Sequence, residues 1–140
     1  MAEVEGIQIE LITPDRVVFC GVVEDVILPG VEGEFGVLKG HETFLSGLDY
    51  GVMSFSVASG KRTYCAIGEG YVEVTGSKAI ILVEMAKLSE EIEQVQVLKD
   101  KEIAEQKLAK MSSDDADFEK IKKEIKIAEV MLATINKEQL

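Results

Sequence analysis

Residues 28–41 read Leu-Pro-Gly-Val-Glu-Gly-Glu-Phe-Gly-Val-Leu-Lys-Gly-His, and glycine recurs every three residues at Gly30, Gly33 and Gly36. Glycine is used where φ is positive or where two backbones approach closely, so this spacing predicts tight turns between short β-strands. A phosphate-binding loop is not favoured, because such a loop needs a lysine and a serine or threonine directly after the glycines and then a helix. Here glutamates stand between the glycines, and residues typical of strands follow.

The segments around this stretch, from residue 6 to about residue 85, are short apolar runs separated by turn residues. Residues 7–11, Ile-Gln-Ile-Glu-Leu, alternate apolar and polar with the period of a half-buried strand. About eight to ten such strands at roughly ten-residue spacing indicate an antiparallel β-sandwich or flattened barrel. We expect residues 62–67 and 71–74 to pair as neighbouring strands across the bend at residues 68–70.

The character of the chain changes near residue 88. From there to residue 140 it has no glycine and no proline, and strong helix formers dominate. The segment 111–115 divides this region into two helices of about 22 residues each, roughly 33 Å long, that return as an antiparallel hairpin. Ser89 is the expected N-cap of the first helix. The fold class is therefore α+β, with a β-domain over residues 1–87 and a helical hairpin over residues 88–140.

The second predicted helix has the clearer apolar pattern. Its apolar residues recur at alternating spacings of three and four, which is a heptad seam. These residues are Phe118, Ile121, Ile125, Ala128, Leu132 and Ile135.

Charge and composition exclude several classes of function. The 26 acidic and 15 basic side chains give a formal net charge of −11, which is the wrong sign for binding nucleic acid. The longest apolar runs are far too short to span a bilayer, and the first residues resemble neither a secretion signal nor a transit peptide. Cys20 and Cys65 stand among apolar residues and are expected to be buried thiols. With one histidine in the chain they provide too few ligands for a closed zinc site.

No catalytic constellation is evident. His41 is the single histidine, no serine or cysteine stands in a nucleophile-elbow context, and no cofactor is implied. An interaction protein is therefore expected rather than an enzyme. A two-helix hairpin has too little core to be stable alone, so its apolar stripe needs the β-domain or a partner, which makes it a candidate switch. The alternative is a stand-alone β-sandwich module that binds a ligand and oligomerises through the hairpin.

Two motifs resemble landmarks of one family, the epsilon subunits of F-type ATP synthases. The first is residues 33–38, Gly-Glu-Phe-Gly-Val-Leu, followed by His41, and the second is residues 68–74, Gly-Glu-Gly-Tyr-Val-Glu-Val. With the helical tail, the resemblance covers the whole chain in order. The chain departs from the family at residues 42–43, where Glu-Thr replaces the usual Ala-Pro.

The resemblance implies a non-catalytic central-stalk subunit of a proton- or sodium-translocating ATP synthase. Such a subunit binds the gamma subunit and the membrane rotor ring, and its hairpin inhibits ATP hydrolysis at the catalytic beta subunits. It would be peripheral to a bacterial cell membrane, on the cytoplasmic side. Gly33, Glu34 and Phe35, on what we expect to be a polar loop, correspond to the rotor-ring contact, and His41 corresponds to the side facing gamma.

The resemblance also gives two expectations for the hairpin. Lys122, Lys123 and Lys126 could meet an acidic segment of the catalytic beta subunits, although a solvated helix face is the default explanation of such a cluster. Some family members bind ATP through Ile/Leu-Asp-x-x-Arg-Ala, whereas residues 92–97 here read Ile-Glu-Gln-Val-Gln-Val. Because the last arginine of the chain is Arg62, the bidentate phosphate fork is missing and ATP binding is not expected.

Overall fold

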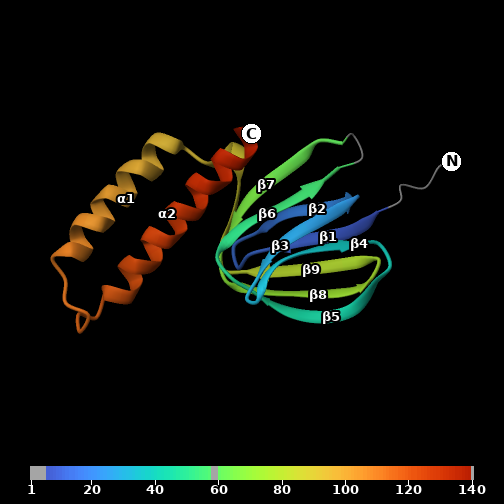
Figure 1. Cartoon of the computed structure of the whole chain (residues 1–140), viewed down its shortest axis with the longest axis horizontal. Helices are drawn as coiled ribbons and strands as arrows, with labels where there is room; N and C mark the ends of the chain where they lie inside the picture. The colour runs from blue at the N-terminus through green and yellow to red at the C-terminus, as the bar shows by residue number, and fades with distance from the viewer. Residues whose placement is uncertain (1–5, 58–59, 140) are drawn as a thin grey trace.

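The computed structural model describes residues 6–57 and 60–139, and it confirms the α+β architecture of a β-sandwich followed by two helices (Figure 1). The described strands are β1 (Ile7–Ile12), β2 (Val17–Val23), β3 (Asp25–Gly30), β4 (Gly33–Leu38), β5 (His41–Leu48), β6 (Gly51–Ser56), β7 (Arg62–Ile67), β8 (Gly70–Gly76), β9 (Lys78–Val83) and β10 (Ala86–Leu88). A 3-10 helix (Ser89–Glu91) leads to α1 (Gln94–Ala109) and α2 (Phe118–Gln139).

The strands form one sheet that folds over into two layers. Its order is β10-β7-β6-β3-β5-β8-β9-β1-β2, and β4 adds to β3 outside this path. β3 joins the layers, because residues 25–27 pair with β6 while Gly30 pairs with Leu48 of β5. Within the described residues the pairs are antiparallel except for β1 and β9, which run parallel.

The hydrophobic core lies between the two layers and follows from period-two alternation. Ile7, Ile9 and Leu11 of β1 point inward and are completely buried, while the residues between them face outward. The rings of Phe19 and Phe55 close the core from opposite layers with their centroids 4.4 Å apart. Each such side chain contributes about 1.5–3 kcal/mol when it is fully buried, so these residues are a major source of stability for the sandwich.

The predicted pairing of residues 62–67 with residues 71–74 is wrong. β7 pairs with β6 and β10, whereas β8 pairs with β5 and β9. Residues 68–70 are therefore a corner at which the chain crosses between layers. Glycine is required at Gly70, because a Cβ there would collide with the carbonyl oxygen of Leu82, whereas a Cβ at Gly68 would meet only side-chain atoms of Glu84 and Met85.

The two cysteines differ, so the expectation of two buried thiols is wrong for one of them. Cys65 on β7 is completely buried, and burial raises the pKa of its thiol to about 12. Cys20 on β2 is exposed. Nearly every residue of β2 is apolar, so the sequence has no polar alternation there to show which side chains face outward.

The helices form an antiparallel hairpin in which α2 lies between α1 and the sandwich, packed on β7 and β6 (Figure 1). α2 has 22 residues as expected, but α1 has 16. Ser89 is not the N-cap of α1, because residues 89–91 form a separate 3-10 turn held by the side chain of Glu91, and α1 begins only at Gln94.

α2 buries two opposite faces. Ile121 and Ala128, from the predicted seam, are buried, as are Val97 and Ala104 of the neighbouring helix α1. The other face contains Val130 and Thr134, which are also buried. At 100° per residue these two share a face with Lys123, which pairs with Glu84, and with Lys137, which lines a pocket together with residues of β3 and β6. The seam was therefore predicted, but the face toward the sheet was not.

Candidate interaction surfaces

The outward side of the layer β5-β8-β9-β1-β2, here called the outer sheet face, is unusually apolar. Leu45, Tyr71 and Val17 expose 67%, 49% and 59% of their surface. Strand register aligns part of this face as one row, since Tyr71 pairs with Leu82, Leu82 with Ile12, and Ile12 with Val17. The apolar members of the face are Ile12, Val17, Val22, Val31, Leu45, Tyr71, Ile80 and Leu82.

Charged residues, among them Glu10, Glu73 and Lys78, share this face, but an exposed apolar row of this kind is typical of a protein–protein contact. The backbone of His41 begins β5 in the same layer and pairs with Gly76 of β8. The residue that the sequence assigned to gamma therefore lies on the sheet whose outer face is apolar. Its contact with gamma stays a prediction.

The tip of the β3–β4 hairpin is the second candidate surface. Gly33 has φ +127° and ends the turn, so Glu34 lies in β4 opposite Pro29 and not in a loop as the sequence predicted. The side chain of Glu34 is exposed, whereas that of Phe35 packs against the core and meets Phe44 edge-on at 5.6 Å. Of the three residues assigned to the rotor ring, Gly33 and Glu34 therefore face solvent and Phe35 faces inward.

The third candidate is the contact between α2 and the sandwich. Nζ of Lys123 lies 2.9 Å from Oε2 of Glu84, and the hydroxyl of Tyr50 donates a hydrogen bond to Oε1 of the same carboxylate. Partial burial and the Glu84 hydrogen bond raise the pKa of Tyr50 to about 12. Burial alone would raise the pKa of Glu84, but the hydrogen bonds from Tyr50 and Lys123 outweigh it and lower that pKa. The hydrogen bond to Glu84 raises the pKa of Lys123.

The three lysines of the predicted inhibitory face have different surroundings. Lys122, Lys123 and Lys126 line one cleft of about 600 Å³ between α2 and the sandwich, together with Tyr50 and Glu69. Lys123 pairs with Glu84, whereas Lys122 lies over the ring of Phe118 with its Nζ 5.7 Å from the centroid.

The sequence missed the residues that connect the two parts of the chain. Tyr50 and Glu84 are 34 positions apart, and Arg16 forms two hydrogen bonds of 3.0 Å to Glu91 across 75 positions. No local motif marks such pairs, because each residue is an ordinary polar side chain in its own segment.

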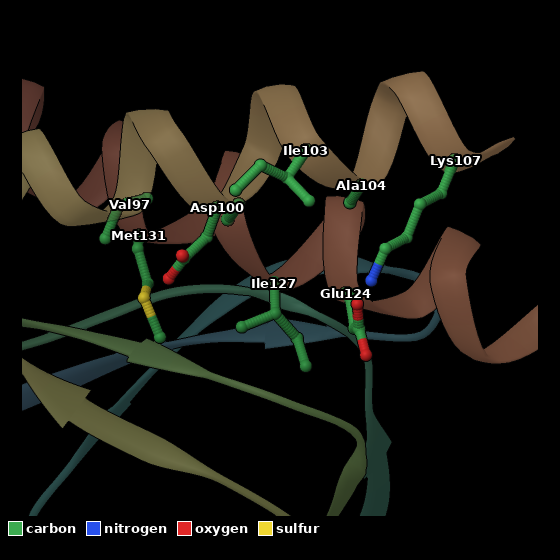
Figure 2. Close-up of a pocket in the computed structure, with 9 residues that line it drawn as sticks. Val97, Asp100, Ile103, Ala104, Lys107, Glu124, Ile127 and Met131 are labelled. Atoms are coloured by element: carbon green, nitrogen blue, oxygen red, sulfur yellow. The ribbon is translucent and has the colours of Figure 1, made fainter. Parts of the chain in front are cut away.

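A groove of about 350 Å³ lies between the two helices (Figure 2). Its charged lining consists of Asp100, Lys107 and Glu124, so it offers one cation and two carboxylates and no bidentate site for phosphate. Absence of ATP binding stays a prediction. In the part of the chain that the structure describes, no cluster of histidine, cysteine, aspartate and glutamate side chains is arranged to hold a metal ion. The residues around the groove are Val97, Asp100, Ile103, Ala104, Lys107, Glu124, Ile127, Ala128 and Met131.

A β-sandwich with an apolar row on its outer face and a helical hairpin packed against it is typical of a protein that binds other proteins. Residues 6–89 match the family described as ATP synthase, Delta/Epsilon chain, beta-sandwich domain. The epsilon chain of Carboxydothermus hydrogenoformans ATP synthase is 37% identical over 76% of this chain and 78% of its own length. That of Nitratidesulfovibrio vulgaris is 38% identical over 76% and 79%. This chain belongs to the ATP synthase epsilon chain family, and its role is therefore that of a non-catalytic accessory subunit.

Solved structures give the same fold. A chain of the Euglena gracilis mitochondrial ATP synthase, from its OSCP/F1/c-ring assembly, aligns with a TM-score of 0.78 at 27% identity, over 91% of this chain and 80% of that one. A chain from the central stalk and c-ring of the Tetrahymena thermophila enzyme aligns at 0.57 and 13% identity, over 94% and 97%, which shows the fold alone. Neither α1 nor α2 is long and apolar enough to cross a bilayer, and an ATP synthase epsilon chain is peripheral to the membrane part of its complex.

Proposed function

We propose that this chain is the central-stalk subunit that couples the catalytic head of an ATP synthase to its membrane rotor ring. The outer sheet face binds the gamma subunit, the tip of the β3–β4 hairpin meets the ring, and the helical hairpin restrains ATP hydrolysis at the catalytic beta subunits. In a bacterium this position is on the cytoplasmic side of the cell membrane. The observation that supports the proposal most directly is the apolar row across β8, β9, β1 and β2.

The apolar row is suited to a long-lived contact with another protein. Its members are apolar side chains on a sheet, and one of them, Tyr71, is of an aromatic type that is enriched among the residues that dominate protein–protein contacts. Membership of the epsilon family and the likeness to a chain of the Euglena F1/c-ring assembly support association with the synthase stalk, and gamma is the partner that we assign to this face.

The ring contact and the hairpin contact are assigned by charge and exposure. Gly33 and the exposed Glu34 give the hairpin a polar side next to the exposed Val31, and we assign this polar side to the polar loops of a rotor ring. Lys122 and Lys126 are exposed on α2 and offer positive charge to an acidic segment of the beta subunits. The alternative of a stand-alone ligand-binding module has no comparable support, since the relatives are synthase subunits.

Co-purification with gamma tests the proposal. Tyr71→Glu combined with Val17→Glu places two charges in the apolar row, and we expect at least a tenfold loss of gamma binding, because an unpaired charge in a buried contact costs several kcal/mol. Gln106→Glu together with Ala109→Glu, at exposed positions of α1, is the control with equal charge. Unchanged binding of gamma by the Tyr71/Val17 variant, folded by circular dichroism, would show that gamma does not use this face.

A further inference from the structure

The parallel pair of strands produces an opening at one edge of the sandwich. β1 and β9 run in the same direction with Ile12 beside Leu82, so both strands end at the same edge. From there β1 continues into the turn at residues 13–16, whereas β9 continues toward β10. Antiparallel neighbours can be joined by one tight turn, but the chains that leave a parallel pair diverge. A pocket of about 390 Å³, here called the corner pocket, lies between them, and its lining includes Ile12, Thr13, Pro14, Glu69, Leu82 and Glu84.

Hydrogen bonds hold both sides of the corner pocket in place. On one side, the backbone N–H of Thr13 donates to the carbonyl of Arg16 at 3.0 Å, and the hydroxyl of Thr13 accepts the N–H of Arg16 at 3.3 Å. On the other side, the backbone N–H of Glu84 donates to the carbonyl of Glu69 at 3.0 Å. Each wall is therefore fixed by its own turn, and a ligand that enters the pocket has little backbone to order.

The lining of the corner pocket combines apolar walls with carboxylates. Ile12, Pro14 and Leu82 supply apolar surface. Ile12 and Leu82 are also members of the apolar row, so the pocket continues that row to the edge of the sheet. Glu69 and Glu84 are the charged residues of the lining. A fitting ligand therefore brings an apolar segment and a positive charge into one small space, and the net charge of −11 also favours a cation.

The two carboxylates of the corner pocket differ in their partners. Glu84 accepts a hydrogen bond from Tyr50 and pairs with Lys123. Glu69 is exposed, and within residues 6–57 and 60–139 its carboxylate forms no ion pair or hydrogen bond. The negative charge that is available to a ligand is therefore that of Glu69.

We propose that the corner pocket receives an arginine side chain of the gamma subunit, with the guanidinium group paired to Glu69 and the methylene groups against the apolar walls. Arginine carries both an apolar stem and a planar cation that can form two hydrogen bonds with one carboxylate. It is also enriched among the residues that dominate protein–protein contacts. The identity of the partner rests on the proposed function, which assigns the adjoining apolar row to gamma. The preference for arginine is a property of this chain alone.

The isolated chain tests this preference with two small probes. N-acetyl-arginine amide carries the side chain of interest, and N-acetyl-citrulline amide has nearly the same shape without the charge. We expect the arginine probe to shift the NMR methyl signals of Ile12 and Leu82 and to bind in roughly the millimolar range, with the citrulline probe roughly fivefold weaker. Glu69→Gln should remove the difference between the probes. Glu105→Gln, at an exposed position of α1, is the matched control and should preserve it.

Gamma binding tests the assignment of the partner. Glu69→Gln should weaken the complex by roughly tenfold to a hundredfold, because it leaves the guanidinium group without its charged partner. Glu105→Gln should leave the affinity unchanged. A double-mutant cycle identifies the occupant when the arginines of gamma are changed to glutamine one at a time. We expect one of these changes to weaken binding to the parent chain but not to the Glu69→Gln chain.

Equal binding of the two probes to the parent chain would overturn the proposal, as would the absence of coupling between Glu69 and every arginine of gamma. Loss of the fold is not expected to confuse these results, because the corner uses the backbone of Glu69 and not its carboxylate. If Glu69→Gln binds gamma normally while the Tyr71/Val17 variant does not, the corner pocket is wrong and the proposed function stands. If the Tyr71/Val17 variant also binds normally, the assignment of gamma to the outer sheet face has itself failed.

Discussion

The sandwich and the hairpin bury their apolar residues to different degrees. In the sandwich, large side chains such as Phe55, Leu28 and Met53 are completely buried between two layers. In the hairpin, the buried residues Val97, Ala104, Ile121, Ala128 and Val130 are mostly small and retain 4–9% exposure. The first region has a core of its own, whereas the second depends on what it lies against. Mobility is therefore expected in the region that is less able to fold alone.

The largest expected effect separates the two cores. Phe55→Ala should lower the free energy of unfolding of the sandwich by about 3–5 kcal/mol, because it leaves a cavity in a closed core. Ile121→Ala should leave the sandwich transition nearly unchanged and should instead speed amide exchange in α1 and α2. Chemical denaturation followed by Cys65 reactivity, with hydrogen exchange of the helices, distinguishes the two. A shift of the sandwich transition by Ile121→Ala equal to that by Phe55→Ala would mean that the regions share one cooperative core.

The sequence predicted the features that depend on neighbouring residues, but not the contacts between residues that are far apart in the chain. Local periodicity predicted the strands, the two helices and the seam with Ile121 and Ala128. It failed for Cys20, because β2 has no polar alternation to show which side chains face outward. It also failed for the partners of residues 62–67, because alternation does not show which layer a strand joins. It also gave no sign that Tyr50, Glu84 and Lys123 meet, since contacts between distant polar residues depend on the finished fold.

Truncation tests the division into two domains. A chain that ends at Glu93 retains β10 and the Glu91–Arg16 contact but lacks both helices. We expect it to fold, to bind gamma, and to lose at most a few kcal/mol of stability, since α2 covers part of β7 and β6. Size-exclusion chromatography and denaturation provide the measurement. An unfolded or aggregated product would show that residues 1–87 are not an independent domain.

Acid should weaken the contacts of the hairpin before it affects the core. The carboxyls of Glu84 and Glu91 both have a pKa below the ordinary 4.5 in the folded chain, Glu91 mainly through its hydrogen bonds from Arg16. Their contribution is therefore complete above about pH 4.5 and is lost as the pH falls through the lowered values. We expect amide exchange in α2, corrected for its intrinsic pH dependence, to rise in this window. In Glu84→Gln the rise should be smaller, and equal profiles would assign the effect to other carboxyls.

The smallest expected effect comes from a comparison of three lysines on α2. Lys122 and Lys126 are compared with Lys123, whose surroundings differ. Lys122 and Lys126 are exposed, so changing both to alanine should weaken contact with an acidic segment of the beta subunits and raise ATP hydrolysis. Lys123 pairs with Glu84 when the hairpin is docked, so Lys123→Ala should favour the undocked hairpin and lower ATP hydrolysis. Each change should be severalfold at most, as expected for exposed ionic contacts, and high salt should reduce both. The rate of ATP hydrolysis by the reconstituted synthase, measured for each variant, shows whether hydrolysis rises or falls. If Lys123→Ala and the Lys122/Lys126 double variant change hydrolysis in the same direction, the lysines act as one face and Lys123 has no separate role in docking.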